Sequence, residues 1–409
     1  MQGGGLTSAL TTEARVAQVA RASYGRLIGI LAARGSDIAT AEDALSDALH
    51  QALTTWPEAG IPDRPEAWLI RVARNRMTDA HRRALKTHPI PIEEHDLAME
   101  PSSPSLPADP RLALMFVCAH PAIGHSARTP LMLQAVLGFT AADIARAYVA
   151  SPAALSKTLT RAKARIKANN IAFALPEPQD RPARLGEVIE AIYGCYALVW
   201  TQGPEADSIQ REAVFLADLL ATEMPDDPEV LGLSALLAFL HSRRDARQVA
   251  GHYVPLSEQD TARWDHGLIH AADARLKQAF ALGAPGRFQI EAAIQAVHAA
   301  RAQTGQTDWQ ALLALYTGLV HLAPTLGAEV GRAMVAGQVH GAQAGLAALD
   351  ALSPAHVARF QPYWATRAHL LSEAGQPAAA EEAYRSAISL THEAPARAFL
   401  MAARARLQN

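Results

Sequence analysis

The chain lacks sequence features that are typical of disulfide-stabilised, secreted and membrane proteins. It has 2 cysteines among 409 residues, Cys118 and Cys195, far apart in the sequence. No disulfide framework is implied, and a reducing cytosol is the expected compartment. The stretch MQGGGLTSALTTEAR has no charged start followed by an apolar segment, so we expect no signal peptide. Residues 311–328 lack Asp, Glu, Lys and Arg, but their helical period predicts a buried helix ending near Pro324, not a membrane span.

The motifs that carry common enzyme chemistry are also absent. No P-loop, HExxH, GxSxG or CxxC occurs. Cys118, His120 and His125 form C-x-H-x4-H, which is three candidate ligands at a spacing that matches no common zinc site. Loop and cap roles are therefore favoured over metal binding for these residues. We expect no enzyme, no cofactor and no metal.

Basic charge is abundant, but it is concentrated. The net charge is −3, yet residues 1–170 carry 19 Lys+Arg and 15 Asp+Glu, whereas the rest carry 18 and 25. The first of two basic runs spans Arg71 to Lys86, and the second spans residues 157–167, which contain no acidic residue. Hydrophobic residues make up 50% and charged residues 19%, which is typical of globular proteins. Alanine, leucine and arginine dominate and no strand pattern is present, so the predicted fold is all-α.

The first basic run lies in residues 65–83, PEAWLIRVARNRMTDAHRR, a predicted helix that starts at Pro65-Glu66. Residues at three- and four-residue steps form its apolar face: Leu69, Val72, Ala73, Met77, Ala80 and Ala84. The same steps on the opposite face give Arg71, Arg74, Asn75, Thr78 and Arg82. Such a stripe is either a solvated surface or a surface for phosphates and bases.

An acidic amphipathic helix is predicted over residues 41–53, AEDALSDALHQAL. Its apolar face consists of Ala44, Leu45, Ala48, Leu49 and Ala52. Its outer face shows Glu42, Asp43 and Asp47. By itself this pattern indicates only a solvated acidic surface.

The second basic run lies in a predicted helix-turn-helix. In residues 140–149, TAADIARAYV, Thr140 and Asp143 form a variant capping box. After a short turn, Ser151 caps a second helix that has Pro152 at its first position. One face of that helix is apolar, with Leu155, Leu159, Ala162 and Ile166. Another face carries Ser156, Lys157, Thr160 and Arg161, flanked by Lys163, Arg165 and Lys167. This geometry places the second helix in the major groove, and the alternative is a helical hairpin with a basic surface.

Two proline-rich stretches divide the chain into three helical domains. Residues 87–110 and 172–185 are predicted linkers, the first of them flexible and acidic. Within the last part, residues 362–390 resemble a tetratricopeptide repeat, with Gly375 at the turn between two helices. Gly341 starts a degenerate copy. The physical interpretation is a stack of helix pairs, each of which buries its apolar face on the next.

Together these segments resemble a bacterial sigma factor of the extracytoplasmic-function (ECF) group. Residues 41–53 resemble the region-2 helix that binds the polymerase clamp helices. Residues 68–83, WLIRVARNRMTDAHRR, resemble the promoter −10 helix, with its Trp-Leu start, Ala-Arg-Asn core and Asp before Arg-Arg. Residues 131–168 resemble region 4, whose second helix contacts the −35 element. A long tetratricopeptide-like tail matches one subgroup, in which the tail takes the regulatory role of an anti-sigma factor.

The resemblance implies a role for each segment. Region 2 spans 1–86, region 4 spans 111–171 and the tail, a TPR-like regulatory domain, spans 186–409. Core RNA polymerase is contacted by Glu42, Asp43 and Asp47. The −10 element is contacted by Arg71, Arg74, Asn75, Thr78 and Arg82, with Asn75 beside the pocket that takes a flipped base. The −35 element is contacted by Ser156, Lys157, Thr160, Arg161, Lys163 and Arg165.

The expected function is an alternative sigma factor in the cytoplasm. Its partners are core RNA polymerase, promoter DNA and a regulatory protein at the tail, with no membrane partner. The recognition helix has Ser156 and Thr158 where relatives often carry Arg, which means fewer bidentate guanine contacts. Two other interpretations stay open: a free-standing helix-turn-helix regulator with a sensory repeat domain, and a repeat-based adaptor with a decayed sigma-like front.

Overall fold

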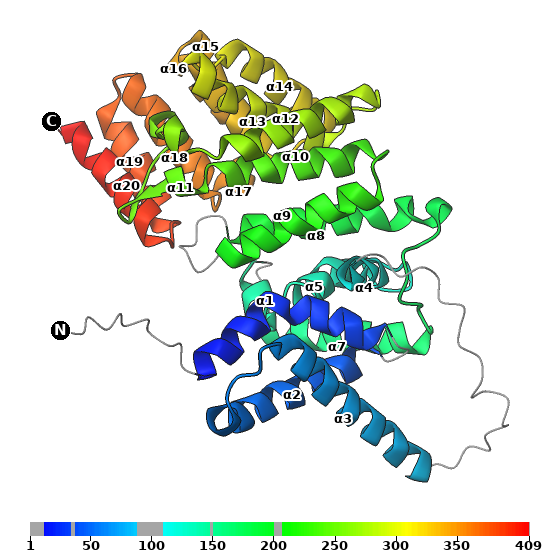
Figure 1. Cartoon of the computed structure of the whole chain (residues 1–409). Helices are drawn as coiled ribbons and strands as arrows, with labels where there is room; N and C mark the ends of the chain where they lie inside the picture. Colours follow the sequence, from blue (N-terminus) through cyan, green and yellow to red (C-terminus); the bar gives the residue numbers. More distant parts are fainter. Residues whose placement is uncertain (1–11, 34–36, 88–108, 148–149, 200–206, 409) are drawn as a thin grey trace, which may run out of the picture. The chain divides into compact units, whose positions relative to one another are not determined.

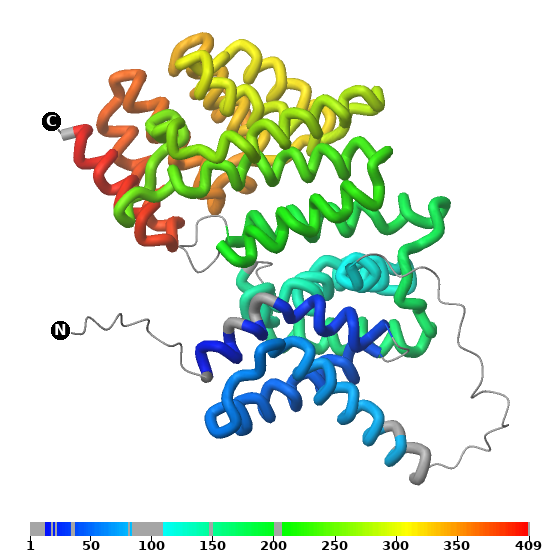
Figure 2. The backbone as a smooth tube through the Cα atoms, in the orientation of Figure 1, coloured from blue at the N-terminus to red at the C-terminus, as the bar shows by residue number. Residues whose placement is uncertain are grey.

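The computed structural model describes residues 12–33, 37–87, 109–147, 150–199 and 207–408. In these ranges the elements are helices, apart from one antiparallel pair of short strands, β1 (Gln248–Val249) and β2 (His252–Tyr253). The predicted all-α fold is confirmed. The chain divides into two compact units, Met1–Leu198 and Val199–Asn409. Figures 1 and 2 show both as assemblies of helices.

The first unit begins with three mutually packed helices, α1 (Thr12–Ala32), α2 (Ile38–Ala59) and α3 (Pro65–Thr87). Asp37 starts α2, because its Oδ1 accepts a hydrogen bond from Thr40 N at 2.8 Å. Trp56 of α2 is fully buried and meets Trp68 of α3 edge to face at 5.4 Å. This contact helps fix how α3 lies on α2.

Four further helices continue the first unit: α4 (Pro110–Cys118), α5 (His125–Ala135), α6 (Ala141–Ala147) and α7 (Pro152–Ala168). Thr140 Oγ1 and the Asp143 carboxylate exchange hydrogen bonds with each other's backbone amides, which is the predicted capping box. Ser151 stands at the N-cap of α7, but its side chain makes no capping hydrogen bond, contrary to the prediction. Asn170 follows α7 in the left-handed region, with φ of 49°.

The predicted linkers have different outcomes. Residues 88–108, most of the first linker, lie outside the described residues. The second, 172–185, contains a short η2 helix (Pro178–Asp180) and leads into α8 (Pro182–Leu198). Helix α8 packs on α4 and α5 and belongs by its contacts to the first unit. Glu187 of α8 lies 3.2 Å from Arg128 Nη1 of α5. The division by contacts falls after α8, and the boundary at 172–185 stays a prediction.

The second unit is a succession of helices in which neighbours along the chain pack side by side (Figure 2). Gly375, with φ of 69°, makes the tight turn between the last long pair, and Gly341 makes another with φ of 93°. The elements are α9 (Asp207–Glu223), α10 (Pro228–Ser242), α11 (Arg244–Arg247), η4 (Leu256–Glu258), η5 (Thr261–Arg263), α12 (His266–Ala281), α13 (Arg287–Thr304), α14 (Trp309–Leu322), α15 (Leu326–His340), α16 (Ala342–Asp350), α17 (Pro354–Val357), α18 (Gln361–Glu373), α19 (Pro377–Ser389), α20 (Ala394–Ala405) and η6 (Arg406–Gln408).

Two apolar clusters show how this stacking buries the helices. One joins α15 through α20 around Tyr363, Leu371 and Tyr384, and the other joins α13 to α15 around Leu312 and Leu319. The uncharged stretch 311–328 is split, because α14 ends at Leu322 and α15 begins at Leu326. Across the described ranges, no helix combines the length and apolar character that crossing a membrane requires.

Candidate nucleic-acid interface

The outward face of α3 carries the side chains that the sequence assigned to the −10 element. Arg71, Asn75, Thr78 and Arg82 are exposed, and Arg74 is half-buried. Thr78 Oγ1 donates to the Arg74 carbonyl at 3.0 Å. Arg82 Nη1 lies 4.0 Å from Asp79 Oδ1 on the same helix, so the Asp79 carboxylate neutralises part of the Arg82 charge. The remaining stripe presents cations and an amide to solvent.

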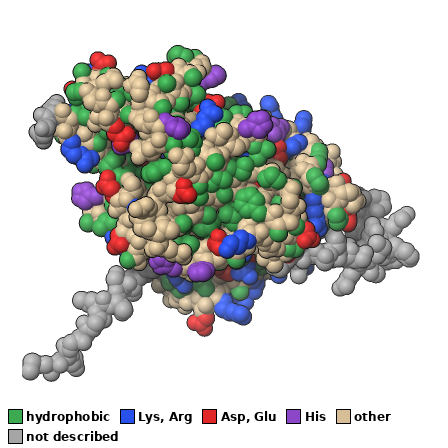
Figure 3. Space-filling view, turned by 90° about the horizontal axis from the view of Figure 1, so that it is seen from above, with side chains coloured by type: hydrophobic (Ala, Val, Ile, Leu, Met, Phe, Trp, Pro, Cys, Tyr) green, Lys and Arg blue, Asp and Glu red, His purple; other side chains and the backbone are tan. Residues whose placement is uncertain are grey.

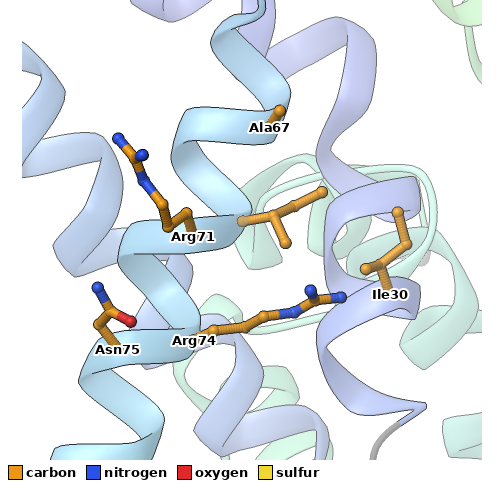
Figure 4. Close-up of a pocket in the computed structure, with 6 residues that line it drawn as sticks. Ile30, Ala67, Arg71, Arg74 and Asn75 are labelled. Atoms are coloured by element: carbon orange, nitrogen blue, oxygen red, sulfur yellow. The ribbon is translucent and has the colours of Figure 1, made fainter.

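A pocket of about 470 Å³ lies between this stripe and α1. Its apolar lining comes from Ile30, Ala67 and Ile70, and its polar lining from Arg71, Arg74 and Asn75. In Figure 4, Arg74 extends from α3 toward Ile30 on α1, whereas Arg71 and Asn75 leave the helix on its other side. An apolar wall beside guanidinium groups suits a flat aromatic group that also carries hydrogen-bond acceptors. A nucleic-acid base has both properties.

The acidic face of α2 differs from the sequence interpretation at one position. Asp43 and Asp47 are exposed, as expected. Glu42 was placed on the outer face, but its side chain is 18% exposed and its Oε2 lies 2.5 Å from Lys163 Nζ. The outer-face assignment of Glu42 is therefore wrong. The reason is tertiary: α7 covers that edge of α2, which a helical period alone does not reveal.

The −35 residues of α7 fall into two groups. Ser156, Lys157, Thr160 and Arg161 are exposed together on one side of the helix. Lys163, by contrast, is 12% exposed and turned toward α2. Arg165 donates from Nη1 to the Ala122 carbonyl at 3.4 Å. The apolar face is buried as predicted, through Leu155, Leu159, Ala162 and Ile166.

Sequence reasoning missed several residues around these helices. Asp37 was not singled out, although an acid directly before an apolar periodic run is a cap signal. Its Oδ2 also lies 2.9 Å from Lys167 Nζ. Gly25 and Gly29 of α1 carried no recognisable pattern, yet both are buried against other helices. These contacts join segments far apart in the chain, so the sequence alone could not show them.

The C-x-H-x4-H segment is accounted for by ordinary contacts. Cys118 is fully buried, and burial raises the pKa of its thiol. His120 Nδ1 accepts from Ala122 N at 3.1 Å, and His125 Nδ1 lies 2.6 Å from Glu187 Oε1. Among the described residues, no three His, Cys, Asp or Glu side chains are grouped as metal ligands would be.

Comparison with known proteins gives matches to two families. Residues 19–87, from within α1 to the end of α3, match the family described as Sigma-70 region 2. Residues 184–280 match a family of unknown function, DUF6596. An uncharacterized protein of Rhizobium meliloti (strain 1021) is 36% identical over 374 residues, which cover 88% of each chain. No solved structure matches the chain significantly.

The α3 stripe and its pocket lie inside the region-2 match, so the exposed arginines and the family assignment concern the same surface. The fold and the match define a class: an all-helical protein whose first unit contains a Sigma-70 region 2 domain. Residues 19–87 form a Sigma-70 region 2 domain, which supports a role in transcription initiation with core RNA polymerase and promoter DNA.

Proposed function

We propose that this chain is an alternative sigma factor of the extracytoplasmic-function type that recognises −35 and −10 elements. The observation that carries the proposal is the α3 surface, where Arg71, Arg74 and Asn75 line a pocket within the region-2 match. Unstacking a base costs a few kcal/mol. The cationic stripe binds the phosphates on either side of the unstacked base. This salt-dependent attraction offsets the cost of unstacking. In this proposal the pocket holds the unstacked −10 base and Asn75 bonds its edge.

The other assignments extend this proposal along the first unit. Asp43 and Asp47 of α2, both exposed, meet basic residues on the polymerase, where rim charges set orientation and association rate. Helix α7 offers Ser156, Lys157, Thr160 and Arg161 to the −35 major groove. Helix α7 is 17 residues long and begins at Pro152, close in sequence to the end of α6 at Ala147, as a recognition helix does.

The second unit is proposed as a TPR-like regulatory domain in the cytoplasm. Stacked helix pairs form extended surfaces that bind proteins. Phe215, Phe280 and Leu322 are 46%, 44% and 48% exposed, and such apolar groups often mark interaction sites. Figure 3 shows a face on which hydrophobic side chains gather near the centre, with histidines and charged groups around them. A regulatory protein is the proposed partner of this unit.

The proposal is tested by co-elution with bacterial core RNA polymerase, followed by transcription from promoter fragments selected for binding. We expect the full chain to co-elute with core and to direct initiation at a defined start. Binding to DNA without any binding to core would contradict it. The free-standing helix-turn-helix regulator would then be the better account.

Removing a cation from α7 should weaken promoter binding in a salt-dependent way. For Lys157→Ala or Arg161→Ala, loss of one phosphate contact lowers the slope of log affinity against log salt by about 1. If the side chain bonds a base instead, the variant loses about 1–3 kcal/mol at one promoter position. Arg385→Ala, at an exposed pair on α19, is the matched control and should match wild type. Identical binding by wild type and both α7 variants at every salt concentration would refute the −35 assignment.

Removing the side-chain amide of Asn75 on α3 should affect promoter melting more than polymerase binding. Asn75→Ala loses hydrogen bonds to one base edge, worth about 1–3 kcal/mol or about 5- to 150-fold in open-complex formation. Affinity for core polymerase should stay unchanged. Promoters with single abasic positions through the −10 element provide the control. The effect of Asn75→Ala should vanish only on the promoter that lacks the contacted base. An effect that persists on every abasic promoter would argue against a base contact.

A further inference from the structure

Helix α8 reaches the start of α5 through one ion pair. Glu187 Oε1 lies 3.2 Å from Arg128 Nη1 of α5, and both side chains are only 15% exposed. His125 Nδ1 lies 2.6 Å from the same carboxylate oxygen. A guanidinium that is withdrawn from water needs hydrogen-bond acceptors for its donors. Glu187 is therefore part of what fixes the position of Arg128.

Arg128 in turn holds the segment that joins α4 to α5, residues 119–124. Its Nε donates to the Ile123 carbonyl at 3.0 Å, and its Nη2 donates to the Pro121 carbonyl at 3.4 Å. The planar fork of a guanidinium bonds several acceptors at fixed relative positions. Without the Glu187 carboxylate, a largely buried cation loses its charged partner, which is strongly unfavourable. We expect Arg128 then to turn toward water and to release this turn.

His120 makes the same turn rigid from within. Ile123 N donates to the His120 carbonyl at 2.9 Å, and Ala122 N donates to His120 Nδ1 at 3.1 Å. Burial, with the positive charges of Arg184 and Arg128 nearby, holds the pKa of His120 below its ordinary value. The imidazole is therefore neutral at neutral pH, and its Nδ1 remains an acceptor. The turn has a defined shape as long as Arg128 stays in place.

The turn also contacts α7, the helix with the basic face. Arg165 Nη1 donates to the Ala122 carbonyl at 3.4 Å, although the Arg165 side chain is exposed. This bond uses one of the five donors of a guanidinium, so the others are available to a phosphate. Helix α5 also packs on both α7 and α8. Glu187, Arg128, the turn and Arg165 thus form a continuous series of contacts from α8 to α7.

We propose that Glu187 is a positioning residue for the −35 contact: it holds Arg128, Arg128 holds the turn, and the turn orients Arg165 for a phosphate. The inference rests on the proposed function, because it takes α7 to be the −35 helix. Ordering a long side chain before binding reduces the entropy that binding costs. Helix α8 lies at the start of the second family match, residues 184–280, so an acid outside α3 and α7 contributes to promoter affinity.

The sign of the effect distinguishes positioning from simple charge. If only long-range electrostatics acted, removing an acid would strengthen binding to DNA. Positioning predicts the opposite result. Immobilising one rotamer-rich side chain changes affinity by about 2- to 10-fold. Glu187→Ala should therefore weaken promoter binding by about that factor.

The test measures the promoter affinity of the full chain in complex with core RNA polymerase, at several salt concentrations. Glu187→Ala is compared with wild type and with Glu187→Gln, which keeps an acceptor for Arg128 and should lose less affinity. Glu258→Ala, at an exposed position of η4, makes the same change of charge and is the matched control. It should not weaken binding. The Tm of each variant shows whether the protein compared is folded.

A double variant determines whether Glu187 acts through Arg165. In a chain that carries Arg165→Ala, the further change Glu187→Ala should have no effect on affinity, because the side chain that it positions is gone. Arg128→Lys cannot bond the two carbonyls as a fork, so it should weaken binding in the wild-type background and not beside Arg165→Ala. A general structural role would lower affinity equally in both backgrounds.

Unchanged or stronger promoter binding by Glu187→Ala, or the same loss with and without Arg165, would overturn the inference. If Glu187→Ala does not fold, Glu187→Gln in the same two backgrounds gives the same decision. If the wild-type complex binds no promoter, the proposed function fails, and the inference fails with it. A wild-type complex that binds, with no specific effect of Glu187, would refute the positioning role alone.

Discussion

On acidification from pH 6.5 to about 4, the second unit should lose roughly 2–3 kcal/mol of unfolding free energy for each of two histidines. Burial, with Arg243 and Arg301 nearby, lowers the pKa of His298 from 6.5 to about 4. Burial, Arg244 and other charges lower the pKa of His241 from 6.5 to about 4. Both imidazoles are therefore neutral in the folded protein above that pH.

The sign follows from proton binding. Between pH 4 and 6.5 the unfolded chain protonates both histidines while the folded unit does not, so unfolding takes up protons. Stability therefore falls as pH falls through this window, by about 1.4 kcal/mol per pH unit for each histidine. Below the folded pKa the loss is complete. Above pH 6.5 these two groups have no effect on stability.

Urea or thermal unfolding of the full chain across this pH range provides the measurement. His298→Gln and His241→Gln should each flatten the pH dependence of the second transition, and the double variant should flatten it most. His321→Gln, at an exposed position, is the control and should leave the dependence unchanged. Equal slopes for wild type and the double variant would show that other groups dominate acid unfolding.

Ending the chain at Leu198 should give a much more stable first unit than ending it at Leu175. The shorter chain lacks α8, which packs on α4 and α5 and contributes buried Leu185, Val188 and Ile192. Each buried apolar side chain is worth about 1.5–3 kcal/mol. In a unit of this size 1 kcal/mol corresponds to about 2–4 °C, so the Tm of the shorter chain should be lower by at least about 10 °C.

Removing α8 should lower the Tm by more than the loss of the Glu187–Arg128 ion pair alone. Removing α8 also removes Glu187 from Arg128, whose side chain is 15% exposed. Glu187→Gln in the longer chain separates this contribution and should lower the Tm by only a few degrees. Scanning calorimetry of the three proteins distinguishes the contributions. Equal Tm values for the two chain lengths would mean that α8 is not an integral part of the first unit.

The local elements could be predicted well, because helical periodicity and helix capping depend on residues that are close in the sequence. The helices predicted over residues 41–53 and 65–83 lie within α2 and α3. The Thr140–Asp143 capping box was also predicted. The site residues themselves stay predictions, to be tested by the α3 and α7 variants.

Errors arose where distant segments meet. Glu42 was assigned to solvent, but Lys163 covers it, and these residues are far apart in the sequence. The boundary before α8, which the prolines at 172–185 indicated, stays a prediction: a family match over residues 184–280 begins there, whereas α8 packs on α4 and α5. Proline restricts the backbone at one position and does not determine which neighbour a helix contacts.

The sequence by itself determined the all-α character, the caps, the cationic stripe of α3 and the basic face of α7, since each depends on residue order over a few helical turns. Only the tertiary structure decided which of those charges face solvent and which face each other. Ion pairs such as Lys167–Asp37 and close approaches such as those at Gly25 and Gly29 arise from packing between helices, which the periodicity within one helix does not determine.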